Sequence, residues 1–156
     1  VKGVYLDAFL DMYNREIISY RISSQPSEGA ILAALNDAVK VTADCPVRRT
    51  FHSDQGWVYQ MAAYHQRLKQ ERIFQSMSRK GTCLDNAIME NFFSILKREM
   101  YYGRVYHSFA RLKLAIQRYI HYYNYVRIKE RLGWLSPVAY RQRHSGDVDL
   151  DEAKQD

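Results

Sequence analysis

The first hydrophobic positions of the chain fall in two short runs. Residues 4–11 and 16–23 are both rich in β-branched and aromatic side chains. Residues 12–15 separate the runs, and Asn14 among them favours a turn. This pattern predicts a β-hairpin at the start of the fold.

Further along, apolar residues alternate between helical spacing and short continuous runs. Strands that alternate with helices after an opening hairpin indicate a mixed α/β sheet with helices on its faces. In chain order the pattern predicts a helix opened by residues 26–28, a strand over residues 47–53, a helix over residues 59–70, a strand over residues 73–77, a helix capped by Asp85 or Asn86 that ends near Tyr101, and a helix over residues 108–125.

Each of the last two helices carries one apolar stripe, which we expect to face the core. The first stripe consists of Met89, Phe92, Phe93, Leu96 and Met100. The second consists of Leu112, Ile116, Tyr119, Ile120 and Tyr123.

Length and composition bound the class of protein. The 156 residues suffice for one domain with a real core, because 47% of them are hydrophobic. Two cysteines without metal-ligand spacing fit a reducing compartment and no disulfide scaffold. No apolar run approaches the length of a membrane span, so we expect no membrane partner.

Positive charge is concentrated in the body of the chain. Residues 145–156 contain five acids and one lysine, which leaves 22 basic against 12 acidic side chains over residues 1–144. So basic a body favours a polyanionic partner, although a domain with a basic solvated surface would share this composition. The acidic end is typical of a solvated tail.

Two carboxylates stand at positions that suit a metal site. Asp54 follows a predicted strand and precedes Gly56 by two residues, and Glu90 lies in the first turns of a long helix. Hard divalent cations take oxygen ligands, so the two residues suggest a Mg²⁺ or Mn²⁺ site, where a metal pair serves phosphodiester displacement. Taken singly, Asp54 also fits a turn or capping residue, and Glu90 a solvated helix face.

Basic residues near Glu90 fit a phosphate-containing substrate. Lys97 follows Glu90 by seven residues, or about 10 Å along nearly the same helix face. Ser94 keeps that face polar, and Arg79 and Lys80 add positive charge before the helix. A DNA strand that crosses this helix would meet both the Glu90 carboxylate and the Lys97 ammonium group.

Several motifs carry a resemblance, in order, over most of the chain. They are Tyr5-Leu6, Asp11, Asn14-Arg15, residues 17–20, residues 52–56 with Tyr59, residues 76–83, residues 85–87, Glu90, Phe92-Phe93, Leu96-Lys97, Tyr123-Asn124, Arg127, Leu132-Gly133 and Ser136-Pro137. In this order they resemble the integrase-core transposases of bacterial insertion sequences. The catalytic domain of that family is similar to retroviral integrase and has an RNase H-like fold.

The resemblance implies roles for individual residues. The family holds two divalent metal ions, Mg²⁺ or Mn²⁺, with two aspartates and a glutamate, and 35 residues separate the second and third. Asp54 and Glu90 match those two places, with 35 residues between them. Lys97 matches a basic position used on DNA, and Arg79, Lys80 and Asn86 are further candidate DNA contacts.

The family's first aspartate lies on a strand upstream of Tyr5. Because the chain starts four residues before Tyr5, we expect that strand and its aspartate to be lacking. Asp11 matches a different family position and Asp7 matches none of the three, so neither is assigned as the missing ligand.

The resemblance also implies an architecture and an activity. We expect an RNase H-like mixed sheet flanked by helices, without its first strand: a catalytic core over residues 1–103, a helical extension over residues 104–144 and an acidic disordered tail over residues 145–156. The implied activity is metal-dependent DNA strand cleavage and strand transfer by a cytoplasmic, nucleoid-associated homo-oligomer on DNA. A catalytically inactive DNA-binding remnant of a truncated transposase is the alternative, and a ribonuclease H-type nuclease explains the helical extension less well.

Overall fold

The computed structural model describes residues 3–45, 49–53, 61–77 and 87–152. Strands and helices alternate along these segments, as the pattern of apolar residues predicts. The elements are β1 (Tyr5–Leu10), β2 (Ile17–Ser23), α1 (Glu28–Val41), β3 (Thr50–Ser53), α2 (Ala62–Gln70), β4 (Phe74–Met77), α3 (Ala87–Leu96), the π-helical turn η2 (Lys97–Tyr101), α4 (Phe109–Tyr125), the short 3₁₀ helix η3 (Glu130–Leu132) and α5 (Pro137–Glu152).

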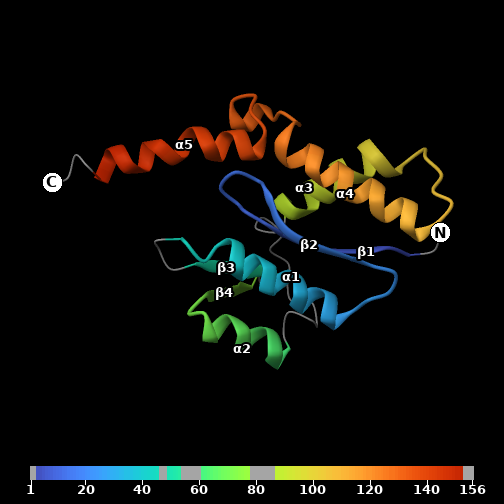
Figure 1. Cartoon of the computed structure of the whole chain (residues 1–156), viewed down its shortest axis with the longest axis horizontal. Coiled ribbons are helices and arrows are strands. Elements are labelled where there is room, and N and C mark those ends of the chain that lie inside the picture. The colour runs from blue at the N-terminus through green and yellow to red at the C-terminus, as the bar shows by residue number, and fades with distance from the viewer. Residues whose placement is uncertain (1–2, 46–48, 54–60, 78–86, 153–156) are drawn as a thin grey trace.

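The antiparallel β1–β2 hairpin is covered by helices on both faces (Figure 1). Leu6 and Ala8 pack into the cluster that α3, η2 and α4 form on one face. On the other face Ser19 donates a hydrogen bond to the Ala34 carbonyl of α1, at 2.7 Å. Alternate residues of a strand point to opposite faces, so this hairpin places its side chains in two separate cores.

The second pair of strands is parallel. β3 and β4 run in register from Thr50 opposite Phe74 to Ser53 opposite Met77, so both strands end at the same edge. No ladder joins this pair to the hairpin among the described strands, although the rings of Phe9 and Phe51 approach to 5.8 Å between centroids. The described strands therefore form one antiparallel and one parallel pair, a mixed β-structure.

Side-chain amides fasten the hairpin to the C-terminal helices. The Asn124 side chain of α4 accepts a hydrogen bond from the Ile17 amide at 2.9 Å and donates one to the Ile17 carbonyl at 3.0 Å. The buried Asn14 donates to the carbonyl of Pro137 at 3.1 Å, and the Tyr123 hydroxyl donates to that of Arg15 at 2.8 Å. Asn124 thus replaces a neighbouring strand at the start of β2, and these motif residues have a structural role.

The helices predicted to start at residues 26–28 and at residue 108 are both capped by a serine in the structure. The Ser27 and Ser108 side chains accept hydrogen bonds from backbone amides in the first turns of α1 and α4. The second predicted helix begins at Ala62, rather than near residue 59, within the part of the chain described.

The C-terminal helix differs from the prediction. α5 extends to Glu152, so residues 145–152, predicted as disordered tail, are helical. Its start is explained by Ser136, whose hydroxyl accepts from the Ala139 amide at 3.3 Å, and by Pro137 in the first turn. Residues 153–156 lie outside the described part.

Candidate metal and DNA-binding site

Glu90 lies in the first turn of α3 with its side chain exposed. Phe92, Ile95 and Leu96 are buried on the opposite side of this helix, so packing fixes the rotation of α3 and leaves Glu90 toward solvent. The structure describes no ion pair or hydrogen bond of the Glu90 carboxylate. Its oxygens are therefore available to an external ligand.

Lys97 and Ser94 extend the same polar face. Both side chains are exposed, and Lys97 begins η2, in which the Tyr102 amide donates to the Lys97 carbonyl at 2.8 Å. The helix is regular from Glu90 to Leu96, so Lys97 lies about 10 Å further along the axis and roughly 20° around it. The structure thus confirms a polar face on which Glu90, Ser94 and Lys97 follow one another.

The other predicted site residues lie outside the described part of the chain. They are Asp54, Arg79, Lys80 and Asn86. Asp54 directly follows Ser53, the last residue of β3, and residues 78–86 connect the end of β4 to α3. Ser53 and Met77, the last residues of β3 and β4, lie opposite each other at one edge of the parallel pair.

Carboxylate oxygens on an exposed face are the donors that Mg²⁺ and Mn²⁺ prefer. The described residues alone contain no group of three or more His, Cys, Asp or Glu side chains able to hold an ion. Glu90 fits a divalent metal by donor type and accessibility, and any further ligands have to come from elsewhere.

No helix in the described segments has both the length and the apolar character needed to cross a bilayer.

An ion pair at the end of η2 links it to α4. Arg127 donates from Nε to both carboxylate oxygens of Glu99, at 2.7 and 2.9 Å, and the Tyr119 hydroxyl donates to the same carboxylate at 3.2 Å. The hydrogen bonds from Arg127 hold the pKa of Glu99 below its usual value. Burial raises the pKa of Tyr119, so its hydroxyl stays a donor.

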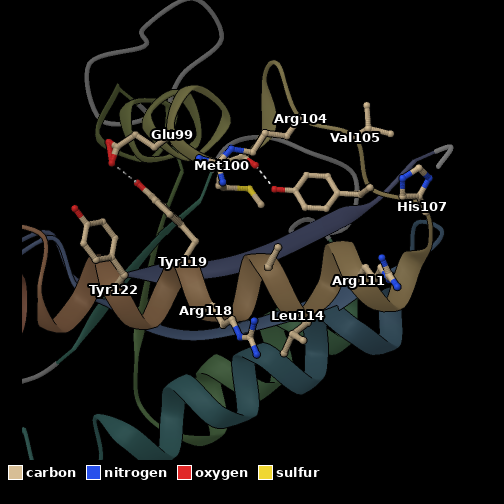
Figure 2. A pocket seen from close by; sticks show the side chains of 12 residues that line it. Glu99, Met100, Arg104, Val105, His107, Arg111, Leu114, Arg118, Tyr119 and Tyr122 are labelled. Carbon is tan, nitrogen blue, oxygen red and sulfur yellow. Dashed lines mark hydrogen bonds between the residues drawn. The ribbon is translucent and has the colours of Figure 1, made fainter.

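One basic feature was not predicted from the sequence. A groove of about 680 Å³ lies between the residues after η2 and the exposed side of α4. We call it the basic groove and define it by Arg104, His107, Arg111 and Arg118 (Figure 2). The seven-residue spacing of Arg111 and Arg118 is a sequence signal for it, but the opposing wall comes from a separate segment.

The β1–β2 hairpin has helices on both faces, and the parallel pair β3–β4 is followed in the chain by α3. This arrangement defines an RNase H-like α/β core of the integrase type. The family described as "Integrase core domain" matches residues 1–83, and a second family with the same description matches residues 90–144. The chain belongs to the integrase core domain family.

Relatives support this assignment over most of the chain. An uncharacterised transposase-like protein of Haemophilus influenzae is 45% identical over 139 residues, which cover 88% of this chain and 63% of that protein. The putative transposase InsK of an insertion sequence element from Escherichia coli is 43% identical over 144 residues, which cover 91% of this chain and 50% of that protein. The chain therefore spans about half to two thirds of these two relatives.

Solved structures share the fold. The HTLV-2 integrase catalytic core domain in complex with magnesium superposes with a TM-score of 0.64 at 10% identity, over 88% of this chain and 82% of that chain. A chain of the simian T-cell lymphotropic virus intasome gives a TM-score of 0.62 at 13% identity, over 80% of this chain and 43% of that chain. These comparisons confirm the RNase H-like fold.

Proposed function

We propose that the chain belongs to an insertion-sequence transposase core that cuts and joins DNA strands with divalent metal. The observation that carries the proposal is the polar face of α3, where Glu90 and Lys97 are both exposed above a buried apolar stripe. The family assignment and the transposase names of the relatives support it.

In this proposal Asp54 and Glu90 hold Mg²⁺ or Mn²⁺. A bound pair of such ions supplies charge stabilisation for the attacking and leaving oxygens of a phosphodiester. The carboxylate of Glu90 provides oxygen ligands without first having to break an ion pair in the described structure. The strand end at Ser53 supports the proposed place of Asp54, because β4 leads from the same edge toward α3.

Lys97 positions the DNA. Its ammonium group is a mobile point charge that contacts phosphate without reading sequence. With Lys97 about 10 Å from Glu90 along α3, one strand can contact the lysine with one phosphate while a phosphodiester further along the same strand lies at the carboxylate. Arg79, Lys80 and Asn86 are proposed as additional contacts to the same strand.

The proposed reaction has two displacements at phosphorus. Water attacks a phosphodiester at a transposon end and releases a 3′-hydroxyl, which then attacks a second phosphodiester without a covalent protein–DNA intermediate. The protein is proposed to act as a homo-oligomer on DNA. Two structural neighbours, a viral intasome and a trimeric form of the HTLV-2 integrase catalytic core domain, support this proposal.

The test is Mn²⁺-dependent nicking of a duplex that carries the transposon end. We expect Asp54→Asn and Glu90→Gln each to reduce nicking to background. Glu28→Gln is the matched control, because Glu28 is also an exposed glutamate in the first turn of a helix, and it should leave nicking unchanged.

Two outcomes would contradict the proposal. Nicking that survives both Asp54→Asn and Glu90→Gln would remove these residues from the site. Tight DNA binding in EDTA with no nicking at any Mn²⁺ concentration would favour the alternative, a catalytically silent DNA-binding remnant.

A further inference from the structure

The basic groove has two walls of different origin. Arg104, Val105 and His107 lie along one side, in the connection between η2 and α4, and Arg111 and Arg118 lie along α4 on the other side (Figure 2). Glu99, which also lines the groove, follows Glu90 by nine positions, or about 13 Å along the helix. The groove is therefore a feature separate from the polar face at Glu90.

Hydrogen bonds hold the groove in shape. The Tyr106 hydroxyl donates to the Met100 carbonyl, which fastens the connection back onto η2. Gly103 takes a left-handed conformation with φ of 76°, which permits the sharp turn after η2. Ser108 caps α4 by accepting from the Arg111 amide at 3.2 Å. A ligand would therefore meet a largely preformed surface, which lowers the entropy cost of binding.

Basic side chains outnumber acidic ones in the groove among the residues that the structure describes. Among the described residues that line it Glu99 alone is acidic, and Arg127 and Tyr119 already bind its carboxylate. The described structure shows no ion pair for the guanidinium groups of Arg104, Arg111 or Arg118. Three free guanidinium groups around one groove favour an anionic ligand, and guanidinium geometry suits phosphate.

The spacing of the cations fits a repeating polyanion. Arg111 and Arg118 lie on one exposed face of α4, about 10 Å apart along its axis. Duplex DNA carries one phosphate per 3.4 Å of axis on each strand, so that distance corresponds to about three phosphate steps. The basic body of the chain, +10 over residues 1–144, attracts the same partner from a distance.

We propose that the basic groove binds the phosphate backbone of duplex DNA as an anchor, apart from the metal site. This inference rests on the proposed function, in which DNA is the substrate. Contacts of this kind fix the position of a duplex and carry no base information. The groove thus holds DNA that flanks the phosphodiester at Glu90.

The test measures DNA affinity as a function of salt for the whole chain, in EDTA, by fluorescence anisotropy. If Arg111 and Arg118 each contact a phosphate, Arg111→Ala with Arg118→Ala makes the negative slope of log K against log salt less steep by about 1.8. The affinity ratio of wild type to this variant should then be about twelvefold larger at 50 mM than at 200 mM salt. The loss should be equal for transposon-end and random duplexes.

Two further variants separate charge in the groove from other causes. Arg111→Lys with Arg118→Lys keeps both charges and should keep most of the slope. Lys40→Ala with Lys69→Ala removes two exposed cations from α1 and α2 and should change the slope much less. An unchanged thermal midpoint for each variant shows that the fold is kept.

An unchanged slope in the double alanine variant would overturn the groove proposal, as would an equal loss in the Lys40 and Lys69 control. If the variant with Arg111→Ala and Arg118→Ala keeps its DNA affinity but loses binding to polyglutamate, the groove binds an acidic protein instead of DNA. An unchanged slope with metal-dependent nicking intact refutes the groove alone. No DNA binding by the wild-type chain refutes the proposed function as well.

Discussion

Asn124→Ala is expected to destabilise the fold strongly, because Asn124 serves as a strand neighbour for β2. The truncation leaves the Ile17 amide and carbonyl without their partners, and both residues are buried, at 4% exposure for Ile17 and 8% for Asn124. A buried polar group left unpaired costs about 1–3 kcal/mol. For two groups, less the gain of about 0.6 kcal/mol from the higher helix propensity of alanine, we expect a loss of about 3 kcal/mol.

For a chain of this length such a loss lowers the melting temperature by roughly 6–12 °C. Urea unfolding followed by circular dichroism measures the free energy, and hydrogen exchange of the Ile17 amide locates the change. Asn91→Ala is the matched control, because Asn91 is exposed on α3, and it should not lower the free energy of unfolding but raise it by about 0.6 kcal/mol at most, through helix propensity. A loss below about 1 kcal/mol for Asn124→Ala, or unchanged exchange at Ile17, would refute the role given to the amide.

Three other variants test the packing and electrostatics. Phe92→Ala should lower the free energy of unfolding in urea by about 3–5 kcal/mol, because Phe92 is 1% exposed and its ring centroid lies 4.9 Å from that of Tyr123. A loss near zero would contradict this packing. Arg127→Ala should cost about 1 kcal/mol at pH 7, a difference that shrinks as pH falls through the lowered pKa of Glu99, so a pH-independent difference would contradict the pairing. Burial lowers the pKa of Lys129 to about 8, so between pH 8 and 10 the unfolded chain binds more protons than the folded chain. The free energy of unfolding should therefore rise with pH in this range, and Lys129→Met should lack this rise.

Local sequence signals predicted the elements whose ends and faces depend on near neighbours. The hairpin, the starts of α1 and α4 and the apolar stripe of α3 all follow from residues within a few positions of one another. α5 was not predicted from the sequence, although Ser136 and Pro137 form a local start signal for it.

Tertiary contacts could not be predicted in the same way. Asn124 and Ile17 are 107 positions apart, and nothing local indicates that an amide replaces a strand there. The basic groove likewise depends on how the segment around Arg104 folds back beside α4. At the candidate site, spacing and resemblance selected Glu90 and Lys97, and packing of α3 explains why both are exposed. That the carboxylates of Asp54 and Glu90 lie close together stays a prediction.

The central claim is that the carboxylates of Asp54 and Glu90 bind the same ions. Mn²⁺ titration followed by electron paramagnetic resonance tests it on wild type, Asp54→Asn, Glu90→Gln and the double variant. If both residues hold shared ions, each single change removes most of the affinity and the double variant loses little more, so the two effects are strongly non-additive. Losses in free energy that simply add, or Mn²⁺ binding unchanged by either substitution, would contradict the claim.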